Sequence, residues 1–340
     1  MKRWHTLLIG LLISAVALYF ALRNVDLAEA VKALRTARYG YVALACVLVV
    51  ATTYLRGVRW RVLTQGRLTA VDGFWLFNIG FLFNNVLPVR LGELARAYLA
   101  GRHPKMHFTS ALSSIIVERL LDMVSVVALL GGLLFGLDLP PALKAGGAAM
   151  GGIALAGIVI LAITARNPDG ILRVAERLAD AIPGLTGERV TGWLGPFAHG
   201  LAGVTDLRVF VVGLGLSLFG WLFSGFMVWV LMLAFWSRVP VSMGLLAVVA
   251  AGLGVSIPSA PSGIGPYQAA VYVALTAVGF DPDVSTSFAF VMHAMGFVMT
   301  SLLGALGLVR EGVSFREVAR AAQGLREQPQ VESGLETPTL

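Results

Sequence analysis

The chain has 340 residues, of which 57% are hydrophobic and only 13% are charged. Soluble domains have about 45–50% apolar and about 25% charged residues, so this composition excludes an ordinary soluble protein and indicates an integral membrane protein. The net charge of +7 would suggest nucleic acid as a partner for a soluble domain. Here the arginines stand in loops beside apolar segments, where membrane topology accounts for them. We therefore expect no nucleic-acid partner.

Eight apolar runs divide the chain into candidate membrane helices, because a helix needs about 20 apolar residues to cross the hydrocarbon core. Alternating ten-residue strands, which are typical of a membrane barrel, are not seen. The first run follows a basic flank, and we expect a retained helix there rather than a cleaved signal peptide. The runs cover residues 7–22, 41–54, 73–87, 110–137, 145–165, 209–236, 244–280 and 285–309.

Two of these runs are poor membrane spans. Run 73–87 has 15 residues before it meets Pro88 and Arg90, and run 244–280 contains three prolines and four glycines within the stretch GLGVSIPSAPSGIGPYQAAV. Proline and glycine at this density interrupt a helix. We expect both runs to be re-entrant, entering the membrane and returning to the same side. The fold class is then an all-α polytopic membrane protein with six spanning helices and two broken, re-entrant segments.

The distribution of positive charge predicts the orientation. With the N-terminus inside, 19 Lys and Arg residues fall on the inner side and six on the outer side, while Arg119 lies within a span. An excess of positive charge marks the cytoplasmic side. We therefore expect a multi-pass protein of the cell membrane with both termini in the cytoplasm. The basic segment 23–38 is an exception, because it falls on the outer side.

A short repeated motif predicts two halves of opposite orientation. Pro88-Val-Arg-Leu-Gly92 and Pro261-Ser-Gly-Ile-Gly265 share the pattern P-x-x-[LI]-G, each after an apolar run. Three crossings in each half would invert one half relative to the other. We expect one transmembrane domain over residues 1–325, with halves at about 1–138 and 145–310. Interfacial helices at about 26–37 and 169–182, and a disordered tail at 326–340, complete the predicted organisation.

The broken segments are the best pointers to a binding site, since paired interruptions in two halves mark the substrate sites of many transporters. Asn84 and Asn85 supply amides that can satisfy unpaired backbone groups at such a break. Helices that restart there aim their N-terminal N–H groups at the break, which favours anions, and Arg90 stands beside the first of them. The backbone residues that we expect to form the two breaks are Pro88, Gly92, Pro258, Pro261, Gly263, Gly265 and Pro266.

Three ionisable residues lie within the span 110–137. Glu118, Arg119 and Asp122 stand in the sequence SIIVERLLDMVSVV. Each would cost about 2.5–3.5 kcal/mol if it faced lipid, so they must face protein or a wet cavity. One interpretation is a structural ion pair that anchors Arg90 or Arg96. The other is direct contact with a charged substrate, or a proton relay.

Two other polar features have plain interpretations. Arg56, Arg59 and Arg61 in YLRGVRWRVL read as a positively charged inner flank, although Arg59 could reach an anionic headgroup. His293, in the last run, is interpreted as a buried histidine with satisfied hydrogen bonds rather than as a proton carrier. His103 and His107 are separated by Pro104, and with a single cysteine in the chain we expect no metal site, no disulfide and no cofactor.

The segments RGVRW, NNVLPVRLGELARAYL, VERLLD and PSAPSGIGPYQAAV, in this order, resemble the lysylphosphatidylglycerol synthase transmembrane-region family over about residues 5–310. This family includes the flippase portion of the bacterial multiple peptide resistance factor, as well as stand-alone proteins. The resemblance implies a polytopic helical protein that moves or binds a lipid. It also implies that a separate soluble domain, which we do not expect here, would perform any aminoacyl transfer. The candidate residues that it carries over are Arg90, Glu93, Arg96, Glu118, Arg119 and Asp122.

Three functions are compatible with these features. The first is a flippase that binds an anionic or aminoacylated membrane phospholipid; the Walker sequence GxxxxGK[ST] is absent, so ATP is not its predicted energy source. The second is a membrane transferase with Glu93 or Asp122 as general base. The third is a non-catalytic partner of an envelope-lipid enzyme. We expect a non-enzyme with a phospholipid as its partner, and the sequence leaves self-association open.

Overall fold

The computed structural model describes residues 35–87, 91–180, 187, 206–257 and 261–327. These residues form helices and short connections, and no strand occurs among them. The elements in chain order are α3 (Tyr39–Leu63), α4 (Ala70–Val86), α5 (Gly92–Gly101), α6 (Phe108–Leu134), α7 (Pro141–Arg166), α8 (Pro168–Asp180), α10 (Leu207–Met232), α11 (Val241–Ser256), η1 (Pro261–Gly263), α12 (Pro266–Ala277), α13 (Pro282–Glu311) and α14 (Phe315–Glu327).

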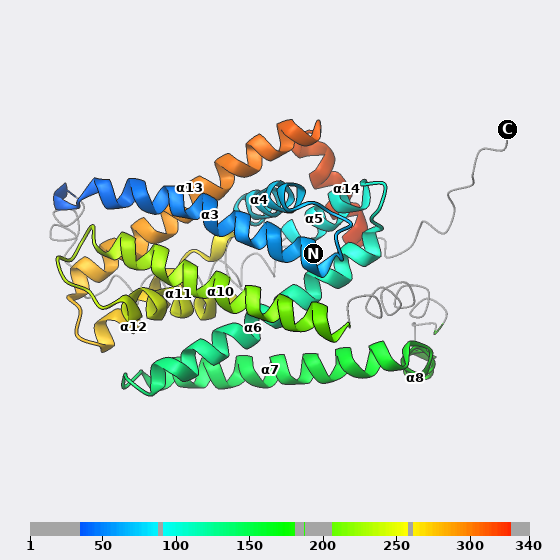
Figure 1. The fold of residues 1–340 in the computed structure, drawn as a ribbon, viewed down its shortest axis with the longest axis horizontal. Helices are drawn as coiled ribbons and strands as arrows, with labels where there is room; N and C mark the ends of the chain where they lie inside the picture. Colours follow the sequence, from blue (N-terminus) through cyan, green and yellow to red (C-terminus); the bar gives the residue numbers. More distant parts are fainter. Residues whose placement is uncertain (1–34, 88–90, 181–186, 188–205, 258–260, 328–340) are drawn as a thin grey trace, which may run out of the picture.

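The long helices α3, α6, α7, α10 and α13 run along the long axis of the molecule (Figure 1). Four helices are long and apolar enough to cross a membrane, namely α3, α10, α13 and the Pro141–Ile160 part of α7. Helix α6 has 27 residues, but three charges interrupt its apolar sequence. Run 7–22 lies outside the described residues. The polytopic helical class is confirmed, whereas six crossings and their orientation stay predictions.

Large apolar side chains cover the outer surface of the long helices. Val211 on α10, Ile160 on α7 and Leu302 on α13 are each more than half exposed. A soluble protein seldom exposes so much contiguous apolar surface, whereas lipid tails are a suitable solvent for it. The helical bundle is therefore built to lie in a bilayer.

Two groups of four helices follow the same order of lengths. Helices α3, α4, α5 and α6 have 25, 17, 10 and 27 residues, and α10, α11, α12 and α13 have 26, 16, 12 and 30. In each group the two short helices pack against each other as a hairpin. Figure 1 shows α5 toward one end of the long axis and α12 toward the other. Both predicted interruptions therefore separate two short helices.

Glycines allow the same close crossing in both groups. Helices α3 and α4 touch at Gly57 and Gly73, where a Cβ on Gly73 would lie 2.8 Å from the Gly57 carbonyl oxygen. Helices α10 and α11 touch at Gly225 and Gly244, where a Cβ on Gly244 would lie 2.5 Å from the backbone nitrogen of Trp229. Small residues at such contacts let helix backbones approach closely in membranes.

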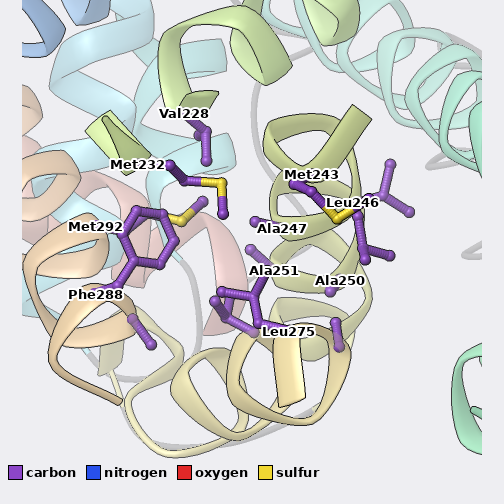
Figure 2. Packing of buried hydrophobic residues seen from close by; sticks show 14 of the residues in the cluster. Val228, Met232, Met243, Leu246, Ala247, Ala250, Ala251, Leu275, Phe288 and Met292 are labelled. Carbon is purple, nitrogen blue, oxygen red and sulfur yellow. The ribbon is translucent and has the colours of Figure 1, made fainter. Parts of the chain in front are cut away.

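The apolar interior has two parts. The larger part lies among α10, α11, α12 and α13, where Met232, Phe288 and Met292 face Ala247 and Leu275 (Figure 2). The smaller part lies among α4, α5, α6 and α14. There Phe83 stacks on Phe315 with ring centroids 4.5 Å apart. Helix α14 is thereby packed against the first hairpin.

Arg38, which belongs to the basic segment 23–38, closes a helix end. Its guanidinium donates hydrogen bonds to the carbonyl oxygens of Leu233 and Trp236, the latter at 2.7 Å. Carbonyl groups at the end of a helix have no partner within the helix and attract cations. At least one positive charge of this segment is therefore explained by helix capping.

The helices differ in extent from the predicted runs. Helix α3 continues nine residues beyond 54, to Leu63, because its arginines find partners within the bundle. Helix α14 extends to Glu327, two residues into the predicted tail. A helix is seen over Pro168–Asp180, whereas its position in the membrane interface stays a prediction. Most of the predicted helix 26–37 and the remaining tail residues, 328–340, lie outside the described part of the chain.

The Gly244→Ala substitution tests the α10–α11 contact. We expect it to lower the free energy of unfolding by about 1–3 kcal/mol, because the added methyl group would overlap backbone atoms. The matched control is Gly152→Ala on α7, where a Cβ would meet no atom within 4 Å. Thermal unfolding of both variants in the same detergent is the measurement. A Gly244→Ala protein as stable as the control would contradict the close contact.

Candidate functional site

Helix α6 brings two carboxylates to one face in the middle of the bundle. Glu118 and Asp122 are four residues apart and lie on the same side of the helix. The Glu118 side chain has no exposed surface and Asp122 is buried. An unpaired carboxylate at such a position would carry a large desolvation cost. Their partners therefore decide whether α6 can pack here at all.

Arg59 of α3 connects both carboxylates. Its Nη1 lies 2.5 Å from Asp122 Oδ1, and its Nη2 lies 3.2 Å from Glu118 Oε1. Nη1 also donates a hydrogen bond of 2.7 Å to the hydroxyl of Ser217 on α10. The side chain is only 3% exposed. Arg59 thus joins α3, α6 and α10 through one guanidinium group.

Arg96 of α5 makes the second buried pair. Both of its terminal nitrogens donate to the Glu118 carboxylate, one of them at 3.2 Å. The guanidinium lies 3.9 Å from the ring centroid of Trp60 and 4.6 Å from that of Phe77. Bidentate pairing and stacking on aromatic faces are arrangements that arginine makes and lysine does not. The structure therefore contains the ion pair that one interpretation of Glu118 required, with Arg96 as its partner.

Two further arginines stand at the edge of this cluster. Arg56 Nη1 lies 3.9 Å from Asp122 Oδ2, and its side chain is 19% exposed. Arg119 lies 3.2 Å from Glu118 and 4.0 Å from Asp122, with 42% of its side chain exposed. Arg119 thus lies within ion-pair distance of both carboxylates. These two guanidinium groups can still reach a ligand that Arg59 and Arg96 cannot.

The charge cluster, defined as Arg56, Arg59, Arg96, Glu118, Arg119 and Asp122, is not balanced. Four guanidinium groups share two carboxylates, which leaves an excess of two positive charges. Glu93 acts electrostatically on Arg119 and reduces the excess to one if it is included. An excess of positive charge inside an apolar bundle favours an anion or water beside its exposed members.

A small cavity opens beside the cluster. Its volume is about 10 Å³, close to what one water molecule needs. The Trp221 indole, at its wall, donates a 3.0 Å hydrogen bond to Asp122. A headgroup would not fit in this arrangement of the helices, so a larger ligand requires α3 and α10 to separate or approaches from the side of Arg119. The residues that line the cavity are Leu55, Arg56, Arg59, Asp122, Leu216, Ser217, Gly220 and Trp221.

The first break is closed by an amide, as predicted. Asn84 Oδ1 accepts a 2.8 Å hydrogen bond from the backbone N–H of Gly92, the first residue of α5. Its Nδ2 donates to the Glu93 carboxylate at 3.3 Å. A helix N-terminus leaves such N–H groups without partners inside the helix. Pro88 and Arg90 lie outside the described residues.

The second break has an unusual backbone. Ser262, Gly263 and Gly265 have φ values of 63°, 73° and 96°, a region that a serine seldom adopts. Helix α12 begins at Pro266, as predicted, and the Gly265 N–H donates a 2.8 Å hydrogen bond to Gln268 Oε1. Pro261 lies in the short turn η1, whereas Pro258 lies outside the described residues.

The two breaks meet at Asn85. Its Oδ1 accepts a 3.3 Å hydrogen bond from the Ser262 hydroxyl, and its Nδ2 donates to Ser301 on α13 at 2.9 Å. His293 of α13 bonds to Ser262 through Nε2 at 2.9 Å and to Gln268 through Nδ1 at 2.7 Å. Both ring nitrogens of His293 thus have hydrogen-bond partners, as expected for a buried histidine. Asn85, which stands before the first break, thus contacts Ser262 within the second.

Sequence reasoning missed three members of the site. The sequence pattern predicts a positively charged flank at Arg56, and it does not single out Ser217 or Trp221 within the run 209–236. Arg56 and Arg59 are three residues apart and share a helix face, which is a signal that could have indicated a common partner. Ser217 and Trp221 are four residues apart on α10, a pattern too common in membrane helices to be informative alone.

The fold and the buried cluster define a multi-pass helical membrane protein. The chain belongs to the family described as Lysylphosphatidylglycerol synthase TM region, which it matches over residues 7–304. The resemblance inferred from the motifs is thereby confirmed. Within the described residues, no group of His, Cys, Asp and Glu that would hold a metal ion is found.

Three relatives extend this comparison. The chain is 24% identical to Glycosyltransferase AglD of Haloferax volcanii, over 95% of this chain and 57% of that protein. It is 26% identical to a UPF0104 membrane protein of Methanothermobacter thermautotrophicus, over 92% and 98%. A second UPF0104 membrane protein, MJ1078 of Methanocaldococcus jannaschii, is 24% identical over 66% and 91%. The chain thus spans little more than half of AglD. No solved structure matches the chain.

The ion pairs predict an asymmetry between two substitutions. Glu118→Gln removes the carboxylate that three arginines share, whereas Arg96→Met leaves Glu118 with two partners and fills the space between Trp60 and Phe77. We expect Glu118→Gln to cost about 3–5 kcal/mol, as is typical when one partner of a buried pair is removed. Arg96→Met should cost clearly less.

Thermal unfolding in detergent measures this difference, and Asp138→Asn in the exposed pair with Lys144 serves as control. The control should unfold like the parent, because exposed pairs contribute little. Equal costs for Glu118→Gln and Arg96→Met would contradict the central position of Glu118.

Proposed function

We propose that the protein is a lipid flippase or lipid transporter that binds the headgroup of an anionic or aminoacylated phospholipid at the charge cluster. The observation that carries this proposal is the excess of arginine charge in the middle of an apolar bundle. A purely structural cluster would gain by balancing its charges, because unpaired buried charge is costly. The cluster instead keeps two guanidinium groups within reach of a ligand.

The members of the cluster divide into two roles. Arg59 and Arg96 are enclosed by carboxylates and aromatic rings, and in our proposal they hold the helices together. Arg56 and Arg119 are the ligand-binding arginines. Arg90, which lies outside the described residues, is a third candidate. The planar guanidinium fork matches two phosphate oxygens. In the same proposal Glu93, which acts electrostatically on Arg119, binds the amino group of an aminoacylated headgroup.

The arrangement of the helices supports transport rather than binding alone. The two four-helix groups share their order of lengths, their glycine crossings and an interrupted hairpin, and we propose that they are inverted repeats with re-entrant hairpins. Repeats of this kind surround the substrate site of many secondary transporters and move against each other during transport. The contact between Asn85 and Ser262 joins the two breaks at their shared boundary.

A transferase is the second candidate, because a relative is named a glycosyltransferase. That relative is much longer than this chain, so its name does not decide which part is catalytic. Asp122 accepts hydrogen bonds from Arg59 and Trp221, which stabilise its charged form and make it a weak base. Glu93 is the better candidate base. The geometry therefore favours binding over catalysis.

Lipid translocation in proteoliposomes tests the proposal. Headgroup-labelled anionic and aminoacylated phospholipids are followed through their protection from an impermeant quencher. We expect Arg56→Gln and Arg119→Gln to lower the rate about tenfold to hundredfold, since each removes a charge-assisted hydrogen bond to phosphate. Arg61→Gln, on the exposed face of the same helix α3, is the matched control and should behave like the parent.

The outcomes separate the candidates. Movement that depends on Arg56 and Arg119, but not on Arg61, supports the flippase. No movement across the lipid panel by the folded parent protein contradicts it. Turnover of a lipid-linked sugar donor would then support the transferase, and its absence would leave the role of a non-catalytic partner of an envelope-lipid enzyme.

A further inference from the structure

A second polar cluster lies where the two breaks meet, and the proposed headgroup site does not use it. It consists of Asn85, Ser262, Gln268 and His293, with the Tyr267 ring stacked on the imidazole at a centroid distance of 4.4 Å. His293 is 8% exposed. Both ring nitrogens are within hydrogen-bond distance of a partner, so the hydrogen bonds of the cluster depend on the protonation state of His293.

The direction of each hydrogen bond in this cluster is determined. The Gly265 N–H can only donate, so it faces the oxygen of the Gln268 amide, and Gln268 Nε2 must face His293 Nδ1. The Phe297 carbonyl can only accept, so it faces Asn85 Nδ2, and Asn85 Oδ1 must face Ser262. Neither amide can be turned without losing a backbone partner.

These directions allow a single form of the imidazole. Gln268 donates to Nδ1, so Nδ1 carries no proton. Ser262 donates its hydroxyl hydrogen to Asn85, so it accepts from Nε2–H. His293 is therefore neutral with its hydrogen on Nε2. A second proton on Nδ1 would point at the N–H of Gln268, and two donors repel each other. To remove this repulsion, the Gln268 amide would have to give up either its contact with His293 or its contact with the Gly265 N–H.

The backbone of the break beside that contact is strained. Ser262 is held at a φ of 63°, which for a serine costs about 1–3 kcal/mol and persists only where surrounding contacts impose it. Its hydroxyl contacts, His293 and Asn85, are those contacts. Protonation on Nδ1 leaves both of these contacts in place and removes the Gln268 link, so the break opens at the Gly265 N–H, which Gln268 holds at the start of α12.

The surroundings of His293 contain no charge that would compensate a proton, as far as the chain is described. Helix α12 presents Tyr267, and α4 presents the neutral Asn85. On α3, Arg56 and Arg59 are engaged by the carboxylates of α6. Asp72 of α4 pairs with Arg310 near the end of α13, and α10 carries its one charge at Arg208, in its first turn.

We propose that His293 is a proton-binding site that latches the two breaks together. The neutral form closes the hydrogen-bond chain from Gly265 to Asn85, and the protonated form opens it. A proton is thus the ion to which movement of the two halves is coupled. The role in transport rests on the proposed function, whereas the proton-dependent opening of the break does not.

Hydrogen–deuterium exchange of the full chain in lipid nanodiscs tests the latch without any lipid transport. The readout is the protection of the Gly265 backbone amide, which Gln268 holds, corrected for the intrinsic rate at each pH. An imidazole ordinarily takes up its proton between about pH 8 and about pH 5. Over that range we expect the protection to fall about tenfold, in proportion to one lost hydrogen bond, while amides of α10 stay protected.

Two substitutions make the test specific. Gln268→Glu keeps an oxygen for the Gly265 N–H and offers a second oxygen to a protonated Nδ1, so the break should stay protected at low pH. His293→Gln cannot be protonated and should give protection that does not change with pH. A parent protein whose protection is independent of pH, or a Gln268→Glu protein that opens like the parent, would overturn the proposal.

These results are independent of the headgroup site. If Arg119→Gln leaves lipid movement unchanged while the break still opens with protonation, the proposed function fails and the latch stands. If the break does not respond to pH while Arg119→Gln abolishes lipid movement, the reverse holds.

Discussion

Two carboxylates on one face of α6 are the interaction on which the arrangement of the other helices depends. Glu118 and Asp122 lie where lipid would make an unpaired charge very costly, so α3, α5 and α10 each bring a hydrogen-bond donor to them. These ion pairs and hydrogen bonds specify which helices are neighbours, whereas apolar packing alone would not specify them. The same requirement explains why α3 continues past Arg56 and Arg59 instead of ending in an aqueous loop.

The breaks obey a related constraint on backbone groups. Irregular backbone at membrane depth is tolerated only where its N–H and C=O groups have partners. Asn84 and Gln268 meet this need with side-chain oxygens, one at the start of each second short helix. Asn85 then connects the first break to Ser262 in the second. Each break therefore satisfies its own backbone N–H group, and Asn85 joins the two breaks.

Much of this could be predicted from the sequence. The apolar runs gave the helices, because length and hydropathy are strong signals in lipid, and proline and glycine located both interruptions. The role of Asn84 followed from the need to satisfy backbone groups. The partners of Glu118 and Asp122 could not be derived, because pairing across helices depends on which helices pack together. Arg56 shows the difficulty, since a flanking arginine and a buried one look alike in sequence.

We propose that the charge cluster is a binding site as well as a structural element, and its ligand can be sought directly. An experimental structure of the full chain in nanodiscs of anionic phospholipid would test this most directly. Our account predicts a headgroup between α3, α6 and α10, with phosphate oxygens within hydrogen-bond distance of Arg56 and Arg119. Lipid found only on the outer surface, with Arg56 and Arg119 turned to the carboxylates alone, would contradict it.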